Sequence, residues 1–164
     1  TFAGCSSLTN LTGLEKWDTG NVEDMFGMFS HCSKLTDLTA LTNWNTENVT
    51  NMDYVFGECH NLADLTPLTN WNTQNVKNMA FTFLCTAITN LTPLANWNVE
   101  NVTNMYGMFE SCRSLKDASA INNWNIINVT SFGEMFSNCS FSLSYPAFTK
   151  RTGYWCDGTF TPTN

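Results

Sequence analysis

The sequence of 164 residues predicts one right-handed, β-rich repeat solenoid of about five coils over residues 1–139, followed by a C-terminal β-hairpin cap over residues 140–164. Three observations predict this fold class. A unit of about 27 residues recurs along most of the chain, apolar residues within the unit are mostly three positions apart, and the last 25 residues leave the pattern. Because a repeat of this length decides the whole architecture, it is the first element to establish.

Several residue types recur in one register. The cysteines follow one another at intervals of 27, 27, 26, 27 and 27 residues, and the tryptophans, Asn-Val pairs and phenylalanines keep the same register. The four series are Cys5, Cys32, Cys59, Cys85, Cys112 and Cys139; Trp17, Trp44, Trp71, Trp97 and Trp124; Asn21, Asn48, Asn75, Asn101 and Asn128, each before Val; and Phe29, Phe56, Phe83, Phe109 and Phe136. The short interval falls where Phe-x-x-Cys becomes Phe83-Leu84-Cys85, so one residue is expected to be missing at that corner.

The spacing within the unit indicates how each coil folds. Apolar residues three apart fit neither an amphipathic helix nor an alternating strand, and the abundant Asn and Thr are poor helix formers. Short strands joined by tight turns would keep the large side chains inward, and the unit length lies in the leucine-rich-repeat range of roughly 20 to 29 residues. Stacked at a strand spacing of about 4.8 Å, each coil would bury its apolar residues against its neighbours. We therefore expect a β-rich leucine-rich-repeat solenoid.

Two segments carry a likeness to a known family. Met28-Phe29-x-x-Cys32-x-x-Leu35 and Trp44-Asn45-Thr46-x-Asn48-Val49-Thr50-Asn51-Met52 resemble the BspA-like leucine-rich-repeat surface proteins of bacteria, and the resemblance spans about residues 2 to 139. It implies a cell-surface, adhesive and non-enzymatic protein. The unit departs from many relatives in placing Leu-x-x-Leu-x-x-Leu before Trp, and the final 25 residues lie outside the repeat.

Composition and chain ends restrict the partners. The formal net charge is -7, and a negative surface repels phosphates, so nucleic acid is not expected as a partner. No apolar run approaches the roughly eighteen residues of a membrane span, and no signal-peptide pattern opens the chain, so no direct membrane insertion is expected. The chain starts in mid-unit at Thr1-Phe2-Ala3-Gly4-Cys5, which predicts a monomeric fragment of a longer protein.

The ladder cysteines are expected to be free, buried thiols that fill one corner of each coil. In-register neighbours would hold parallel Cβ atoms about 4.8 Å apart, beyond the roughly 3.5 to 4.5 Å of a disulfide. Cys156 lies outside the array and could reach Cys139, so this pair is the candidate disulfide.

Two polar series are predicted on the coil surfaces. The Asn of each Asn-Val pair is interpreted as a structural ladder whose amide bonds the backbone of its own turn and of adjacent coils. Calcium is an open alternative for the second series, although carboxylates spread one per coil do not specify converging oxygen ligands. No metal site and no cofactor are predicted, and glycosylation of the Asn-x-Ser/Thr sequons is a further alternative. The second series is Asn10, Asp37, Asp64, Asn90 and Asp117.

Four aromatic residues stand off the ladders, at one of two positions between the recurrent Met and Phe. Core positions of a stacked array keep register, so these four are predicted on or near the surface. Such a row is a candidate ligand-binding strip, because large rigid side chains dominate interface energetics. The alternative is that they only pack over the edges of the coils. They are Phe26, Tyr54, Phe81 and Tyr106.

The sequence offers no catalytic constellation. His31 and His60 lie on opposite sides of the ladder cysteine in successive coils, and neither accompanies a nucleophile or a carboxylate in a fixed relation. Both are interpreted as surface turn residues, and no catalytic residue is predicted.

The C-terminal segment carries a hairpin signal. Asp157-Gly158 separates the β-formers Tyr154-Trp155-Cys156 from Thr159-Phe160, which is typical of a two-residue hairpin turn. A cap is expected there because an open terminal coil would expose apolar core.

These observations together predict a non-enzymatic binding or adhesion module of an extracellular, bacterial cell-surface protein, with a protein or host extracellular-matrix ligand as its partner. One alternative is a structural stalk that displays another domain. A less favoured alternative is an enzyme fragment acting on surface glycans, which would need a cleft with paired carboxylates.

Overall fold

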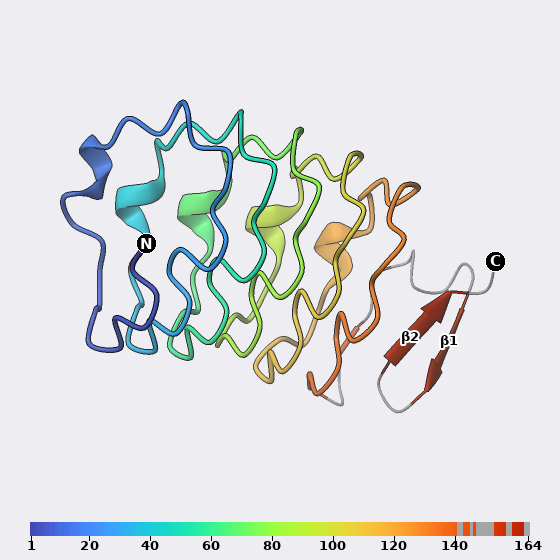
Figure 1. The fold of residues 1–164 in the computed structure, drawn as a ribbon. Helices are drawn as coiled ribbons and strands as arrows, with labels where there is room; N and C mark the ends of the chain where they lie inside the picture. Colours follow the sequence, from blue (N-terminus) through green and yellow to red (C-terminus); the bar gives the residue numbers. More distant parts are fainter. Residues whose placement is uncertain (141–142, 145, 147–152, 157–158, 163–164) are drawn as a thin grey trace.

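The computed structural model describes the chain apart from residues 141–142, 145, 147–152, 157–158 and 163–164, and describes only the backbone of 153–156 and 159–162. Residues 2–135 wind into successive coils that stack side by side in chain order (Figure 1). Each coil starts at a phenylalanine of the Phe ladder, which begins one unit earlier than expected, at Phe2. Coils 1 to 5 are residues 2–28, 29–55, 56–82, 83–108 and 109–135.

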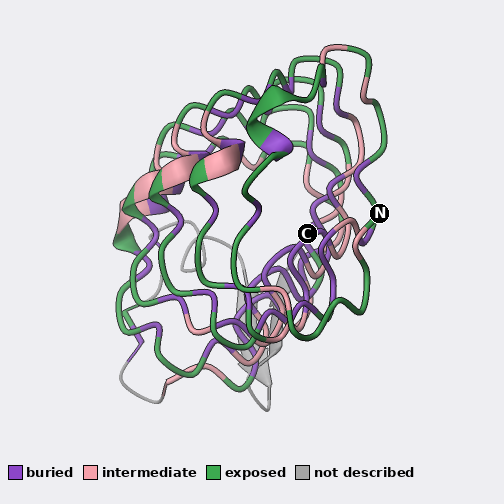
Figure 2. Ribbon diagram, turned by 90° about the vertical axis from the view of Figure 1, so that its left-hand side faces the viewer, coloured by how far each residue is buried: buried purple, intermediate pink, exposed green. Residues whose placement is uncertain are grey.

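Each coil contains one short 3₁₀ helix, and the five helices lie in a row along the stack (Figure 2). An Asp or Asn lies two residues before the start of four of them, as in coil 2, where Asp37 Oδ1 accepts a hydrogen bond from the Thr39 N–H at 2.8 Å. This local bond tightens the chain into a turn, which is why Asn and Asp recur here. The helices are η1 (Leu14–Lys16), η2 (Thr39–Leu41), η3 (Thr66–Leu68), η4 (Thr92–Leu94) and η5 (Ser119–Ile121).

The prediction of a β-rich solenoid is wrong. Residues 1–140 contain no strand, and the coils are joined instead by isolated parallel bridges such as Asn51↔Asn78 and Asn78↔Asn104. The described strands are β1 (Gly153–Cys156) and β2 (Thr159–Pro162), an antiparallel hairpin on either side of the expected turn. How their side chains would cap the last coil lies outside the described residues.

The physical reason is that the backbone donors of each coil are divided between two uses. At the start of coil 2, Phe29 N–H donates to Val55 O, one turn of the solenoid further along the chain, at 2.9 Å, whereas Ser30 N–H closes a turn onto Gly27 O at 3.1 Å. Tight turns and residues with positive φ alternate along this segment, so bonds between coils form at every second residue without an extended strand. Because these turns close over three residues, as from Ser30 N–H to Gly27 O, the apolar residues recur three positions apart.

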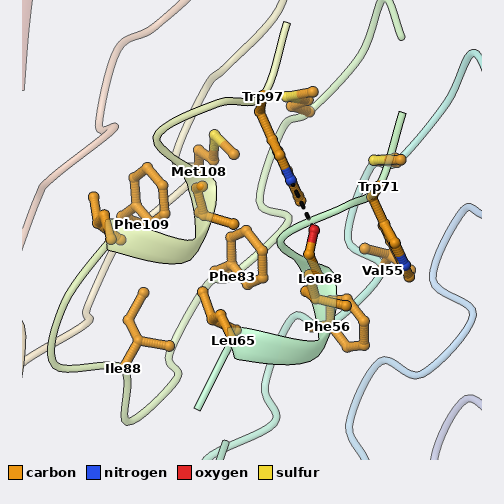
Figure 3. Close-up of a cluster of buried hydrophobic side chains, with 14 of the residues drawn as sticks. Val55, Phe56, Leu65, Leu68, Trp71, Phe83, Ile88, Trp97, Met108 and Phe109 are labelled. Carbon is orange, nitrogen blue, oxygen red and sulfur yellow. Dashed lines mark hydrogen bonds between the residues drawn. The ribbon is translucent and has the colours of Figure 1, made fainter. Parts of the chain in front are cut away.

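Stacked ladders form the core. The rings of the Phe ladder are nearly parallel to their neighbours, with the Phe56 and Phe83 centroids 5.8 Å apart. Trp97 lies beside them and its indole Nε1 donates to Leu68 O of the preceding coil at 3.1 Å (Figure 3). Each fully buried side chain of this size contributes roughly 1.5–3 kcal/mol. The inward orientation of the Trp ladder is confirmed for Trp44, Trp71, Trp97 and Trp124, which are buried.

The Asn-Val amides also link the coils. Asn75 Nδ2 donates to Glu47 O at 2.7 Å, and the equivalent amides of Asn48, Asn101 and Asn128 make the same bond to the coil before. Each amide satisfies a carbonyl that a turn leaves without a backbone donor. The prediction of a structural Asn ladder is therefore confirmed for these four.

Candidate functional site

The predicted aromatic residues lie in the turn that follows a recurrent methionine, which is Met25, Met52, Met79 and Met105 in coils 1 to 4, and Phe132 takes its place in coil 5. The second position of this turn has a left-handed backbone in every coil, with φ of 56° at Gly27, 60° at Tyr54, 50° at Phe81, 58° at Gly107 and 58° at Glu134. A residue with a β-carbon costs roughly 1–2 kcal/mol in this conformation. Tyr54 and Phe81 therefore occupy strained positions where coils 1 and 4 use glycine.

The two strained rings lie over glycines. A β-carbon added to Gly57 would be 2.9 Å from Tyr54 Cδ1, and one added to Gly107 would be 2.5 Å from Phe81 Cε1. Gly57 does not have a positive φ, so the space taken by the Tyr54 ring accounts for glycine there. In coils 1 and 4 the aromatic residue moves to the preceding position, as Phe26 and Tyr106.

Three of the four predicted residues come together. Ring centroids are 6.1 Å apart for Tyr54 and Phe81 and 5.4 Å apart for Phe81 and Tyr106, both in edge-to-face geometry. His31 extends the row, with its ring 5.7 Å from that of Tyr54. Phe26 is 61% exposed and makes none of the ring contacts found in the described part of the chain. We call His31, Tyr54, Phe81 and Tyr106 the aromatic strip.

The strip is partly exposed. Tyr106 is 38% exposed, Tyr54 and Phe81 are half-buried, and His31 is exposed. The rings therefore pack over glycine backbone and also keep an exposed edge. His31 and His60 are surface turn residues as predicted, but the sequence did not indicate that His31 joins the strip.

Carboxylates border the strip. Glu110 Oε2 would be 3.1 Å from a β-carbon on Gly107, which places this carboxylate beside the Phe81 ring. Burial raises the pKa of Glu110, and the charges of Glu134 and Glu58 raise it further. Burial also raises the pKa of Tyr54 to about 12, with the Glu58 carboxylate as the next cause.

Asp53, next to Tyr54 in the chain, has its pKa raised by burial, although a hydrogen bond from Asn78 Nδ2 at 3.3 Å acts in the opposite direction. Among the described residues Asp53 and Glu110 form no ion pair with Lys or Arg, and Glu58 pairs with His60 at 3.4 Å. Sequence reasoning missed these carboxylates, because no shared residue type marks their positions.

The register expected for Cys85 needs correction. Cys85 has φ of 55° and occupies the left-handed position of His31 and Glu58, while the buried Thr86 takes the place of the ladder cysteine. Thr86 Oγ1 donates to Phe83 O at 2.9 Å and lies 3.3 Å from Cys112 Sγ. The missing residue of coil 4 is therefore between Thr86 and Ile88, not between Phe83 and Cys85.

This shortening coincides with a shallow pocket of about 380 Å³. One wall carries His60, whose Nδ1 lies 3.1 Å from Cys85 O. The pocket is lined by His60, Cys85, Thr86, Ala87, Ser111, Arg113 and Ser114.

Cys5, Cys32, Cys59 and Cys112 are free thiols as predicted, and all of these except the exposed Cys5 are buried. Each buried Sγ–H donates to a Phe carbonyl of the preceding coil, as from Cys59 to Phe29 O at 3.1 Å. Burial raises the pKa of Cys59 and of Cys112 to about 12. The side chain of Cys156 lies outside the described residues, so its disulfide with Cys139 stays a prediction.

The acidic series holds the turns before the 3₁₀ helices. Asp117 Oδ1 accepts from the Ser119 N–H at 2.8 Å, and this backbone bond is the first cause that lowers the pKa of Asp117. Within the described residues no group of three or more His, Cys, Asp or Glu side chains is placed to hold a metal ion. None of the helices in the described part of the chain is long and apolar enough to cross a bilayer.

The fold and the aromatic strip define a repeat protein whose side chains vary over a constant backbone. The chain belongs to the family described as Mycoplasma protein of unknown function, DUF285, which matches residues 1–90 and, in a second overlapping placement, residues 58–149. No match was found among curated proteins or among solved structures.

Proposed function

We propose that this protein is a non-enzymatic binding module of a bacterial cell surface, and that it contacts a protein or host extracellular-matrix partner through the aromatic strip. The observation that carries the proposal is the placement of Tyr54 and Phe81 at left-handed positions, where the same turn uses glycine in coils 1 and 4. Strained backbone of this kind concentrates at functional sites. The resemblance to BspA-like surface proteins supports the same proposal.

The strip has the physical properties of a binding surface. Aromatic side chains bury a large area at little entropic cost, and they dominate the energy of many protein interfaces. Edge-to-face contacts between Tyr54, Phe81 and Tyr106 hold the rings in place before a partner arrives. Since little ordering remains to be done on binding, more of the contact energy is available as affinity.

The test uses Tyr106, because it is the most exposed of the three aromatic residues predicted from sequence that form the strip. We expect Tyr106→Ser to weaken binding to the matrix protein that the wild type recognises, within a panel of purified extracellular-matrix proteins, by about 30-fold. This factor corresponds to roughly 2 kcal/mol for one interface aromatic residue. The matched control is Ile127→Ser, since Ile127 is 79% exposed and lies in another turn.

The two variants also separate the alternatives. A structural stalk would show no binding by the wild type, and equal binding by Tyr106→Ser and wild type would exclude the strip as the contact surface. Thermal unfolding of each variant checks that the fold is retained.

A further inference from the structure

We infer that the segment bound by the aromatic strip is cationic, an Arg- or Lys-bearing stretch of another protein. This inference rests on the proposed function and names the chemistry of its partner. It is argued from charge complementarity, since carboxylates border the rings along the strip.

The first step is the position of the carboxylates. Asp53 precedes Tyr54, Glu110 lies beside the Phe81 ring above Gly107, and Glu58 acts on the Tyr54 hydroxyl. All three carboxylates are half-buried, and they come from coils 2, 3 and 5. A partner that covers the rings must therefore also desolvate negative charge.

The second step is the lack of compensating charge. Within the described chain, Asp53 and Glu110 form no ion pair with Lys or Arg, and the ion pair of Glu58 is with the imidazole of His60 at 3.4 Å. Burial is the first cause that raises the pKa of Glu110 and of Asp53, and like charges act in the same direction, from Glu134 and Glu58 on Glu110 and from Asp24 on Asp53. The positive charge of Arg113 acts on the neighbouring Cys85. The whole chain has a net charge of -7, so negative charge is in excess.

The third step compares partner chemistries. An apolar segment would bury these carboxylates without a partner, which is unfavourable, and an acidic segment would add repulsion. A guanidinium or ammonium group can lie against an aromatic ring and pair with a neighbouring carboxylate at the same time. Only a cationic segment therefore satisfies the rings and the carboxylates together.

The experiment measures the affinity of a labelled peptide that alternates Arg and Gly, with Gln-Gly and Glu-Gly peptides of equal length, by fluorescence anisotropy at low salt. We expect the Arg peptide to bind and the other two to bind at least about tenfold more weakly, a difference of about 1.4 kcal/mol. The double variant Glu58→Gln/Glu110→Gln should lose about the same factor.

The control variant is Glu47→Gln/Glu100→Gln, which removes the same charge from exposed residues in the Asn-Val turns. If the carboxylates beside the strip bind the Arg peptide, this control variant should change the affinity less than twofold. If net charge alone attracts the peptide, both double variants should lose the same affinity. Equal losses for the two double variants, or equal binding of the Arg and Gln peptides, would overturn the inference. If Tyr106→Ser still weakens binding to a matrix protein in that case, the proposed function stands and only the cationic partner fails.

Discussion

The ring of Phe81 in coil 3 occupies the space that a side chain on Gly107 in coil 4 would need, because a β-carbon there would be 2.5 Å from Phe81 Cε1. Gly107 also has a φ of 58°, so two separate requirements favour glycine at this position. The pair joins the aromatic strip to the stack, since the ring packs directly on the backbone of the next coil.

Gly107→Ala should therefore lower the free energy of unfolding by more than the cost of placing Ala in a left-handed conformation, because its β-carbon would also clash with the Phe81 ring. The matched control is Gly27→Ala, which has φ of 56° and would place its β-carbon 3.3 Å from Ser30 Oγ, with no ring nearby. We expect a loss of about 1–2 kcal/mol for Gly27→Ala and about 1–3 kcal/mol more for Gly107→Ala in urea unfolding. Phe81→Ala in the Gly107→Ala background should recover that excess, and equal losses for the two glycines would contradict the ring contact.

Trp71 is the second test, because it lies in the middle of the stack. It is 4% exposed, its Nε1 donates to Leu41 O at 3.1 Å, and its ring stacks on Trp97 at 6.4 Å. Trp71→Ala should cost about 3–5 kcal/mol, since it leaves a cavity between two coils and removes the indole bond to Leu41 O.

Trp17 provides the comparison within the same ladder. It is 47% exposed at the open end of coil 1, so Trp17→Ala should cost clearly less. Equal losses of unfolding free energy for the two variants, measured by urea titration, would show that stability is not set by neighbouring coils.

The periodic part of this architecture could be read from the sequence, because side chains that stack on their own copies must recur. Phe83 and Trp97 each lie against copies of themselves, and their spacing therefore defines the coil. The backbone conformation could not be predicted in the same way. Apolar spacing of three is compatible both with short strands and with the alternating turns that the structure contains.

Left-handed residues are the main reason for this failure. Glycine marks such positions at Gly27 and Gly107, but Tyr54, Phe81 and His31 adopt the same conformation without a sequence signal. The strip could be predicted only as off-ladder aromatic residues, and the contacts that join them depend on these backbone angles.

Cys85 shows a different limit. Thr and Cys are similar in size, and Thr86 fills the place of the ladder cysteine while bonding Phe83 O with its hydroxyl. Alignment by residue identity therefore assigned Cys85 to the ladder-cysteine position of coil 4, whereas in the structure Thr86 occupies that position. Similar shape and hydrogen-bonding capacity allowed the exchange without disturbing the core.

The corrected register predicts which thiols react. Cys5 is exposed and Cys85 is half-buried, whereas Cys59 and Cys112 are buried and have pKa values raised to about 12. Because the thiolate is the reactive form, iodoacetamide at mildly alkaline pH should label Cys5 first, then Cys85, and Cys59 and Cys112 only in denaturant. Peptide mass spectrometry gives the order, and native labelling of Cys112 as fast as Cys5 would contradict the assigned core position.

The last prediction concerns pH and depends on the opposite shifts of two carboxyl groups. Burial raises the pKa of Glu110 above its value in the unfolded chain, so the ionised group destabilises the fold at neutral pH. Glu110→Gln should therefore be more stable than the wild type at neutral pH, and this advantage should shrink as the pH falls through the folded-state pKa. Asp117 has a lowered pKa, so its carboxylate stabilises the fold above the unfolded-state pKa, and this contribution disappears as the pH falls through the folded-state value.

Asp117→Asn should consequently be less stable than the wild type at neutral pH and equal to it in acid. Asn can keep the turn itself, as Asn90 does in coil 4 by accepting from the Thr92 N–H at 3.1 Å, so the difference reports the charge together with the bond that Ser119 Oγ donates to Asp117 Oδ2 at 2.9 Å. Urea titrations of both variants and the wild type across the acidic range give the two curves. Differences of the same sign for both variants would contradict the environments that the structure gives to Glu110 and Asp117.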